Sequence, residues 1–239
     1  MKFIKRIVFI LIRIIFIVLL IISIYNIYKC YTENKKTRTI LNNITKSITV
    51  DENNRSSIDF TSLKEENSDV IAYLKVNGTD ICYPVVKSNN NEYYLNHSFD
   101  KSISGAGWIF IDYRNKLDDS DKNLIIYGHN RRDGSMFGTL KNILNKDWYE
   151  NKENKYIIFN KENEDVMYEV FSVYQIEEED YYLKTTFIND EFNNFIKKLK
   201  QRSIKDFNTE ITEMDSILTL STCANDNNYR VVLHAKKIN

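Results

Sequence analysis

The 239-residue sequence predicts a mainly β domain carried on one N-terminal transmembrane helix. An apolar run fills residues 7–24, and eight short runs rich in β-branched and aromatic residues follow from residue 71 onward. Six glycines and one proline are too few for collagen-like, proline-rich or flexible-linker architectures, and a hydrophobic content of 43% is ordinary for a globular domain. These observations argue against a disordered chain and indicate a folded domain on a membrane anchor.

Charge divides the chain into two unequal parts. The first 30 residues hold five basic residues and no acidic one, so the remainder carries a net charge of −5 although the whole chain is neutral. A domain that binds nucleic acid usually presents a basic surface. We therefore expect no nucleic-acid partner for the folded part.

Residues 7–28 are expected to form the transmembrane anchor. A helix rises about 1.5 Å per residue, so one through this run approaches the roughly 30 Å thickness of the hydrocarbon core. Arg13 lies close enough to one end to extend its charge to the headgroups, and Tyr25 and Tyr28 suit the opposite interface. The anchor would place membrane lipid among the partners of this chain.

The basic residues before the anchor predict its orientation. Lys2, Lys5 and Arg6 lie in the tail at residues 1–6, which the positive-inside rule keeps in the cytoplasm. A cleavable signal peptide is the rival interpretation, but no A-x-A-like site follows the apolar run. We therefore predict a single-pass protein of the cell membrane, with its N-terminus cytoplasmic and its folded domain extracellular.

A polar stalk is expected at residues 29–66, between the anchor and the folded domain at residues 67–239. Four apolar residues in the stalk have the spacing of a short helix with one apolar face, and they are Ile40, Leu41, Ile44 and Ile48. Such a face more often packs on a neighbouring domain than forms a site. We therefore expect the stalk helix to contact the domain.

The folded domain is expected to contain eight strands and two helices. The strands cover residues 71–76, 81–86, 108–111, 124–129, 155–159, 166–176, 217–222 and 229–238. One helix is expected at 138–148 and the other at about 190–200, where phenylalanine, isoleucine and leucine recur at helical spacing. Eight strands of this kind suit a β-sandwich or a β-barrel.

Cys223 is the candidate nucleophile among three cysteines. Cys30, Cys82 and Cys223 are too few and too widely spaced for a disulfide scaffold or a four-ligand zinc site. Cys223 ends the apolar strand ILTLSTC directly before the polar loop ANDNN, and nearby cations would favour its thiolate. A buried, inert cysteine is the alternative. Cys82 lies inside an apolar run and is expected to be a small core residue.

His129 and Arg230 are the residues that could assist Cys223. His129 ends the run NLIIYGH, and Arg230 opens the strand that follows the loop after Cys223. A cysteine nucleophile needs a partner that exchanges protons near neutral pH, which histidine does. A structural histidine and a surface arginine are the alternatives. One thiol, one imidazole and one guanidinium at apolar strand ends together favour thiol-based catalysis.

The other polar candidates are expected to be structural. Asp112 and Arg114, in the segment IDYRN, look like a local ion pair. His234 lies on the same strand face as Arg230 but roughly 13 Å away at about 3.3 Å per residue, and His97 lies in a polar loop. We therefore expect none of these four side chains to act on substrate.

The motifs around these residues resemble the sortase family. TLSTC resembles the sortase signature T-L-x-T-C, IIYGHN the segment that carries the sortase histidine, and RVVLHAKKI the strand that carries the sortase arginine. The segments YPVVKSNNNEYYLN and WIFIDYRN, with a helix between the sixth and seventh strands, resemble class B sortases in particular. The resemblance covers about residues 60–239.

The resemblance implies a closed eight-stranded sortase-type β-barrel with appended helices, preceded by the transmembrane helix. It also implies a cysteine transpeptidase at the surface of Gram-positive bacteria. Cys223 would be the nucleophile, His129 the general acid and base, and Arg230 the group that holds the substrate carbonyl or its oxyanion. The chemistry would require no metal and no organic cofactor.

The substrates implied by the resemblance are surface proteins that bear a C-terminal sorting signal. The signal would be NPxTx-like or SPxTG-like and would be cleaved after Thr, and an amine of a peptidoglycan precursor would accept the acyl group. In class B sortases the groove for the signal uses positions that fall here on Asn91, Leu95, Tyr182, Leu183 and Ser221.

Two other functions fit some of the same sequence features. One is a cysteine peptidase that hydrolyses cell-wall peptides, although papain-like wall hydrolases place cysteine before histidine and here His129 precedes Cys223 by 94 residues. The other is a non-catalytic, membrane-tethered β-domain that binds a ligand and holds Cys223 inert. Slow alkylation of Cys223 without loss of function would favour the binding domain.

Overall fold

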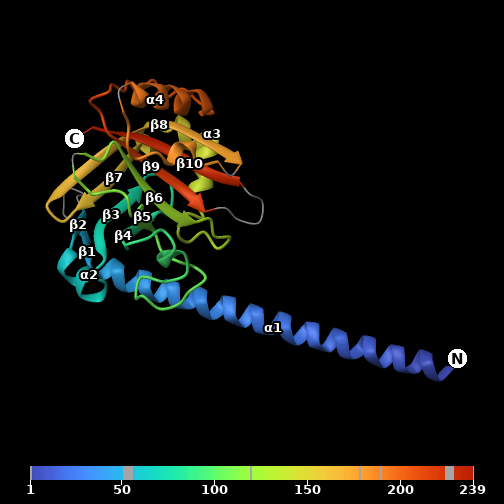
Figure 1. Ribbon diagram of the computed structural model, residues 1–239. Helices are drawn as coiled ribbons and strands as arrows, with labels where there is room; N and C mark the ends of the chain where they lie inside the picture. The colour runs from blue at the N-terminus through green and yellow to red at the C-terminus, as the bar shows by residue number, and fades with distance from the viewer. Residues whose placement is uncertain are drawn as a thin grey trace.

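The computed structural model describes residues 2–50, 56–118, 120–177, 179–188, 190–223 and 229–238, while the side chain of Cys223 lies outside the described part. Its centre is a closed barrel of eight strands, and one long helix projects from the barrel (Figure 1). The predicted fold class is therefore confirmed, and of the sandwich and the barrel that the strands allowed, the chain forms the barrel.

Each barrel strand begins and ends within two residues of the predicted run. In chain order they are β3 (Val70–Val76), β4 (Cys82–Val86), β5 (Phe110–Ile111), β6 (Asn123–His129), β7 (Tyr156–Lys161), β8 (Glu164–Glu177), β9 (Ile217–Cys223) and β10 (Tyr229–Lys237). Around the barrel they lie in the order β10-β8-β7-β3-β4-β5-β6-β9. The pairs β4–β5 and β6–β9 are parallel, and the other neighbours are antiparallel.

The parallel strand β6 lies deep in the barrel wall. Six of its seven residues are buried, which is typical of a strand covered on both faces. Trp108, just before β5, is fully buried and donates its indole N–H to the carbonyl of Pro84 at 2.9 Å. Trp108 thus fills part of the interior with its one side-chain donor paired.

The N-terminal helix differs from the prediction in its length. α1 runs without interruption over Lys2–Lys46, so the expected anchor and the expected stalk helix form one helix. No glycine or proline occurs between residues 2 and 46, and so nothing in the sequence ends the helix between the two parts. Ile40 and Ile44 are buried against the domain, as their spacing predicted.

The part of α1 nearer the N-terminus projects away from the barrel (Figure 1). It contains a window long and apolar enough to cross a membrane, and no residue of that window is buried in the protein. Its composition and exposure fit a membrane anchor. Beyond α1, a two-stranded sheet of β1 (Ile48–Val50) and β2 (Ser56–Ile58) and the short helix α2 (Phe60–Glu66), none of them predicted, lead into the barrel.

The expected helix at residues 138–148 is divided in two. Its parts are the 3-10 helix η2 (Leu140–Leu144) and the helix α3 (Lys146–Glu150), because Asn145 between them has extended backbone angles. The remaining 3-10 turns are η1 (Tyr93–Leu95), η3 (Lys152–Lys155) and η4 (Tyr181–Leu183).

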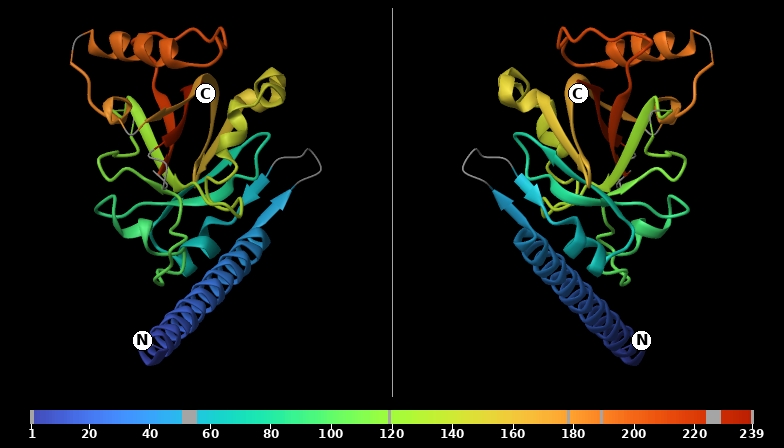
Figure 2. Two further views of the ribbon diagram at one scale, coloured as in Figure 1. Left: turned by 90° about the vertical axis from the view of Figure 1, so that its right-hand side faces the viewer. Right: turned by 90° about the vertical axis from the view of Figure 1, so that its left-hand side faces the viewer.

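The second expected helix is α4 (Glu191–Arg202), which packs on the outside of β8. Its buried residues Phe192, Phe195, Ile196 and Leu199 join Phe171 of β8 in a second apolar cluster. α4 and α1 lie on opposite sides of the barrel (Figure 2). The helical spacing of the four apolar residues therefore predicted a real packing face.

Three side chains outside the predicted site can now be placed. Cys82 is exposed, so the prediction of a core residue was wrong: it is the first residue of β4, and its sulfur lies 3.1 Å from the hydroxyl of Tyr73. His97 is half-buried and stacks on Tyr93 with ring centroids 4.0 Å apart. His234 is fully buried and hydrogen-bonded, as expected for a structural residue.

Candidate active site

Three adjacent strands bring the predicted catalytic residues to one end of the barrel. β6 and β9 pair in parallel with His129 opposite Cys223, at about the 4.8 Å spacing of neighbouring strands. β10 pairs with β9 in antiparallel fashion, with Val232 opposite Ser221. Arg230 precedes Val232 by two residues and Cys223 follows Ser221 by two, so both lie at the same end of this strand pair. The cysteine backbone therefore lies between those of the histidine and the arginine.

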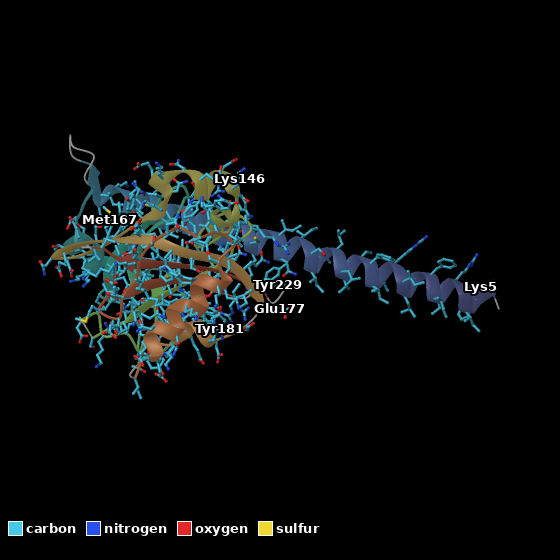
Figure 3. All side chains as sticks on the ribbon, turned by 90° about the horizontal axis from the view of Figure 1, so that it is seen from above. Lys5, Lys146, Met167, Glu177, Tyr181 and Tyr229 are labelled. Carbon is cyan, nitrogen blue, oxygen red and sulfur yellow. The ribbon has the colours of Figure 1, made fainter. Side chains whose placement is uncertain are left out.

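Hydrogen bonds hold the two strand ends around Cys223 together. The hydroxyl of Thr222 accepts a hydrogen bond of 2.9 Å from the backbone N–H of Val231, and Thr222 is fully buried. On the far side of β10, Tyr229 pairs with Glu177 of β8. Figure 3 shows Tyr229 and Glu177 at the end of the barrel that faces along the projecting α1.

The imidazole of His129 is oriented by a backbone carbonyl. Its Nε2 lies 2.9 Å from the carbonyl oxygen of Leu95 at the end of η1, and a carbonyl can only accept. Nε2 therefore carries hydrogen, and this assignment makes Nδ1 the nitrogen for proton exchange. Gly107 lies against the same ring, because a Cβ there would come within 2.8 Å of Cδ2 of His129.

Arg230 and Ser221 meet at the hydroxyl of Tyr182. Tyr182 and Ser221 are fully buried, and their hydroxyls share a hydrogen bond of 3.0 Å. Burial raises the pKa of the Tyr182 hydroxyl, while the bond to Ser221 and the charge and hydrogen bonding of Arg230 act in the opposite direction. The guanidinium is thus held beside η4, close to the end of β9.

A buried carboxylate lies beneath residue 91. Asp112 is fully buried and accepts hydrogen bonds from Nε and Nη2 of Arg114, both at 2.8 Å, from the hydroxyl of Tyr127 at 2.9 Å and from Nδ2 of Asn91 at 3.0 Å. Burial alone would raise the pKa of this carboxyl, but the bonds from Arg114 and Tyr127 outweigh it and lower the pKa. The carboxylate is therefore charged at neutral pH.

The same arginine reaches the segment that contains η4. Nη2 of Arg114 also donates to the carbonyl of Leu183 at 3.0 Å. Nδ2 of Asn123, at the start of β6, donates to the carbonyls of Tyr182 at 3.1 Å and Lys184 at 2.9 Å. The Asp112–Arg114 pair thus joins residue 91 to residue 183, and Asn123 fixes the carbonyls on either side of residue 183.

The five predicted substrate-binding residues differ in burial. Tyr182 and Ser221 are fully buried, whereas Asn91, Leu95 and Leu183 are half-buried. The structure connects each of them to a neighbour of the site: Asn91 to Asp112, Leu95 to His129, Leu183 to Arg114, and Tyr182 to Ser221 and Arg230. Tyr182 and Ser221 can therefore act on a substrate only through their neighbours.

The wider role of the residues that support the site was not apparent from the sequence. Asp112 and Arg114 were predicted as a local ion pair, which they form, yet their contacts extend to both sides of the site. Asn123 was not singled out, although a polar side chain at the start of an apolar strand was a usable signal. The polar loop ANDNN that follows Cys223, residues 224–228, lies outside the described residues.

Comparison with known proteins identifies the family. The sortase domain family matches residues 74–238. Sortase B of Listeria monocytogenes is 34% identical over 223 residues, which cover 86% of this chain and 87% of the relative. A Staphylococcus aureus sortase B–substrate complex has a TM-score of 0.70 and 31% identity, and the match covers 85% of this chain and 92% of that one.

A further solved structure, of Clostridium perfringens sortase B, has a TM-score of 0.70 and 37% identity, and the match covers 75% of this chain and 100% of that one. All three of these relatives are class B sortases, as the segments around residues 83–96 and 108–115 predicted. The family match covers most of the chain and includes all three strands of the candidate site. The chain therefore belongs to the sortase family of cysteine transpeptidases.

Proposed function

We propose that this protein is a membrane-anchored sortase that cleaves a C-terminal sorting signal after Thr and transfers the acyl group to an amine of a peptidoglycan precursor. The observation that carries the proposal is the register of β6 and β9, which aligns His129 with Cys223. The substrate complex of the S. aureus relative supports the choice of a sorting-signal peptide as the first substrate.

In the first step the thiolate of Cys223 attacks the carbonyl carbon of the Thr residue, and a C–S bond forms. Arg230 stabilises the charge that develops on the carbonyl oxygen, and one such donor contributes roughly 10² to 10³ in rate. The C–N bond then breaks, and His129 supplies the proton that the departing amine takes up. The product is a thioester on Cys223.

In the second step an amine attacks the thioester. Its nitrogen forms a new C–N bond to the carbonyl carbon, the C–S bond breaks, and the sulfur leaves as the thiolate. His129 takes the proton that the amine loses, so the enzyme returns to its starting state. Neither step uses a metal or an organic cofactor.

The sorting signal would bind between residues 91–95 and residues 181–184. Asn91, Leu95 and Leu183 are half-buried and can contact it directly. Tyr182 and Ser221 are fully buried, so we assign them the role of positioning Arg230 and the strand that carries Cys223. Specificity for an NPxTx-like or SPxTG-like signal would then depend on the half-buried residues.

The anchor would hold the enzyme at the outer face of the cell membrane. In this division residues 1–6 are the cytoplasmic tail, 7–28 the transmembrane anchor, 29–66 the stalk and 67–239 the catalytic domain. Basic residues at the N-terminus and an exposed apolar window in α1 support this orientation.

The proposal is tested by mass spectrometry of the detergent-solubilised full chain, incubated with a panel of sorting-signal peptides. Wild-type protein should gain the mass of the acyl fragment, Cys223→Ala should gain none, and Arg230→Lys should acylate at least about tenfold more slowly because Lys lacks the fixed fork of donors. Cys82→Ala is the matched thiol control and should acylate normally.

An adduct on Cys223→Ala would refute the assignment of the nucleophile. Cleavage of wall peptides without transfer to an amine would favour the cysteine peptidase. Retention of peptide without any covalent adduct would favour a binding domain.

A further inference from the structure

The segment that contains η4, residues 181–184, is held by a side chain from the barrel wall. Asn123 of β6 donates through Nδ2 to the carbonyl of Tyr182 at 3.1 Å and to that of Lys184 at 2.9 Å. Asn123 is fully buried, and a buried amide needs partners for both its nitrogen and its oxygen. The position of this segment therefore depends on what holds the amide of Asn123.

The two carbonyls fix the direction of the hydrogen bonds behind Asn123. Because Nδ2 of Asn123 donates to both carbonyls, Oδ1 is the acceptor of the amide. The hydroxyl of Thr219 lies 2.6 Å from Oδ1 and donates its only hydrogen to it. Thr219 must therefore accept at its other contact, 2.9 Å from Nδ1 of His234, so Nδ1 carries hydrogen.

The imidazole of His234 extends this direction to two tyrosines. His234 is fully buried, and burial lowers its pKa to about 3, so the ring is neutral at pH 7. With hydrogen on Nδ1, Nε2 can only accept, and the hydroxyl of Tyr174 at 2.8 Å donates to it. Tyr174 in turn accepts from the hydroxyl of Tyr181 at 3.0 Å. Each group between Tyr181 and the two carbonyls thus has one defined role.

These hydrogen bonds begin and end in the same segment. Tyr181 is the first residue of η4, and the last acceptors are the carbonyls of the next residue and of Lys184. On its other side Tyr181 faces α4: Nζ of Lys198 lies 3.8 Å and Cζ of Arg202 5.3 Å from the centre of its ring (Figure 3). Cations over an aromatic face are attracted to it. η4 is therefore held at both ends by groups from four barrel strands and α4.

We infer that Tyr174, Thr219 and His234 are positioning residues for the sorting signal, which act by fixing residues 181–184 through this directed series of hydrogen bonds. This role rests on the proposed function, which assigns residues 181–184 to one wall of the groove. The three side chains are buried, so they reach the signal only through that wall. An apolar residue at position 219 or 234 would fill the same space but would break the series.

Substrate binding should depend on this series more than the chemical steps do. Leu183, which is half-buried and assigned to contact the signal, lies between the two carbonyls that Asn123 holds. A wall that is already ordered loses less conformational freedom when the signal binds. The hydroxyl of Tyr182 has its own hydrogen bond to Ser221, so the neighbour of Arg230 stays in place when the series is broken.

NMR of the full chain in detergent, with ¹⁵N-labelled histidine rings, tests the direction of the hydrogen bonds at pH 7. The chain has three histidines, so the spectrum holds three sets of ring signals, and His234→Gln assigns one of them. The ring of His234 should be neutral, with its hydrogen on Nδ1. Hydrogen on Nε2 alone, or on both nitrogens, would overturn the inferred direction.

Thr219→Val and Thr219→Ser test the positioning role. Val has nearly the shape of Thr but leaves Nδ1 of His234 and Oδ1 of Asn123 without a partner, whereas Ser keeps the hydroxyl. Thr219→Val should raise KM for a sorting peptide at least about fivefold with kcat within about twofold of wild type, and Thr219→Ser should restore KM to within about twofold. Hydrogen exchange of the backbone amides at residues 181–184 should be faster in Thr219→Val alone. A loss of folded protein would lower kcat and leave KM unchanged.

Tyr181→Phe provides a second variant that does not disturb the core, because Tyr181 is half-buried. It removes only the first donor of the series and should raise KM about threefold. Tyr156→Phe is the matched control: Tyr156 is also half-buried, but it begins β7 and pairs with Glu169, eight residues along β8 from Glu177 at the catalytic end. It should keep the wild-type KM.

An unchanged KM in Tyr181→Phe, with Thr219→Val either unchanged or unfolded, would overturn the positioning role. A lower kcat without a change in KM would do the same, since it would mark the three residues as structural only. Both results could occur with normal cleavage by wild-type protein, which would leave the proposed function intact. Absence of any cleavage by wild-type protein would instead overturn the proposed function, and hydrogen exchange without substrate would still decide whether the series holds residues 181–184.

Discussion

Asp112 is the buried charge on which the geometry of the site depends. Removing a carboxylate from water is costly, and here the guanidinium of Arg114, the Tyr127 hydroxyl and the Asn91 amide compensate for that cost. Arg114 in turn binds the carbonyl of Leu183, so one ion pair orients two residues assigned to substrate binding. An interaction that looks local in the sequence therefore acts across the site.

Arg114→Lys should weaken substrate binding more than it affects folding. Lys keeps the positive charge but cannot reach both oxygens of Asp112 and the carbonyl of Leu183 at once. We expect KM for the sorting peptide to rise roughly fivefold with kcat nearly unchanged, since the change displaces binding residues and leaves the catalytic ones in place. Steady-state cleavage of a fluorogenic peptide measures both parameters.

The melting temperature should also fall in Arg114→Lys, because the fully buried Asp112 loses one of its two guanidinium hydrogen bonds, while the charge that Lys keeps limits the loss. Arg38→Lys, on an exposed position of α1, is the matched control and should behave as wild type. An unaltered KM in Arg114→Lys would show that the pair does not position the groove.

At the scale of elements, a chain of buried polar groups connects four strands of the barrel. His234 of β10 bonds through Nε2 to the hydroxyl of Tyr174 on β8 at 2.8 Å and through Nδ1 to Thr219 of β9 at 2.9 Å. Thr219 donates to Asn123 of β6 at 2.6 Å. Asn123, whose side chain donates to the carbonyls of Tyr182 and Lys184, is thus itself hydrogen-bonded to the β9–β10 pair that carries Cys223 and Arg230.

The burial of His234 makes the free energy of unfolding depend on pH. Burial lowers the pKa of His234 from 6.5 to about 3 in the folded protein, so the unfolded chain binds the extra proton first. The stabilisation is fully present above about pH 6.5 and is lost as the pH falls toward the folded value. As the pH falls from 6.5 to about 5, the difference in proton binding at His234 should lower the free energy of unfolding by about 2 kcal/mol.

Denaturant unfolding of wild type and His234→Gln at several pH values tests this. The variant should be less stable at pH 7, because its neighbours lose their partner, yet its stability should change by about 2 kcal/mol less than that of wild type between pH 6.5 and about pH 5. Parallel pH profiles for the two proteins would show that His234 does not titrate on unfolding in this range.

At the scale of the whole molecule, α1 would relate the barrel to the membrane if the chain is anchored as proposed. The helix is continuous over 45 residues, and its C-terminal part is buried against the domain at Thr37, Ile40 and Ile44. A continuous helix is stiffer than a flexible polar linker, so under the proposed anchoring it would hold the barrel at a set height and rotation above the bilayer. Access to the active site would then depend on the position of the membrane surface as well as on the barrel.

The native protein should keep Met1 and remain with the membrane after an alkaline wash. The reasons are the basic tail, the exposed apolar window of α1 and the missing A-x-A-like site after it. Terminal peptide mapping of protein from the washed membrane fraction measures both properties. A mature N-terminus beyond residue 25, or release by the wash, would contradict the anchor.

The sequence by itself determined the elements and the chemistry of this protein. Apolar runs with local periodicity predicted the barrel strands and α4, because the periodicity of a strand or a helix depends only on residues close together in the sequence. The segment TLSTC and the positions of His129 and Arg230 at strand ends predicted the candidate catalytic residues. The apolar window of α1 was predictable for the same local reason.

Only the tertiary structure decided how those residues meet. The parallel pairing of β6 with β9 joins segments 94 residues apart, and no local pattern states which strands pair or in which register. The exposed position of Cys82, the contact of Arg114 with Leu183 and the packing of α1 beside His129 are decided in the same way. Each depends on which surfaces the closed barrel brings together, which follows from packing over the whole chain.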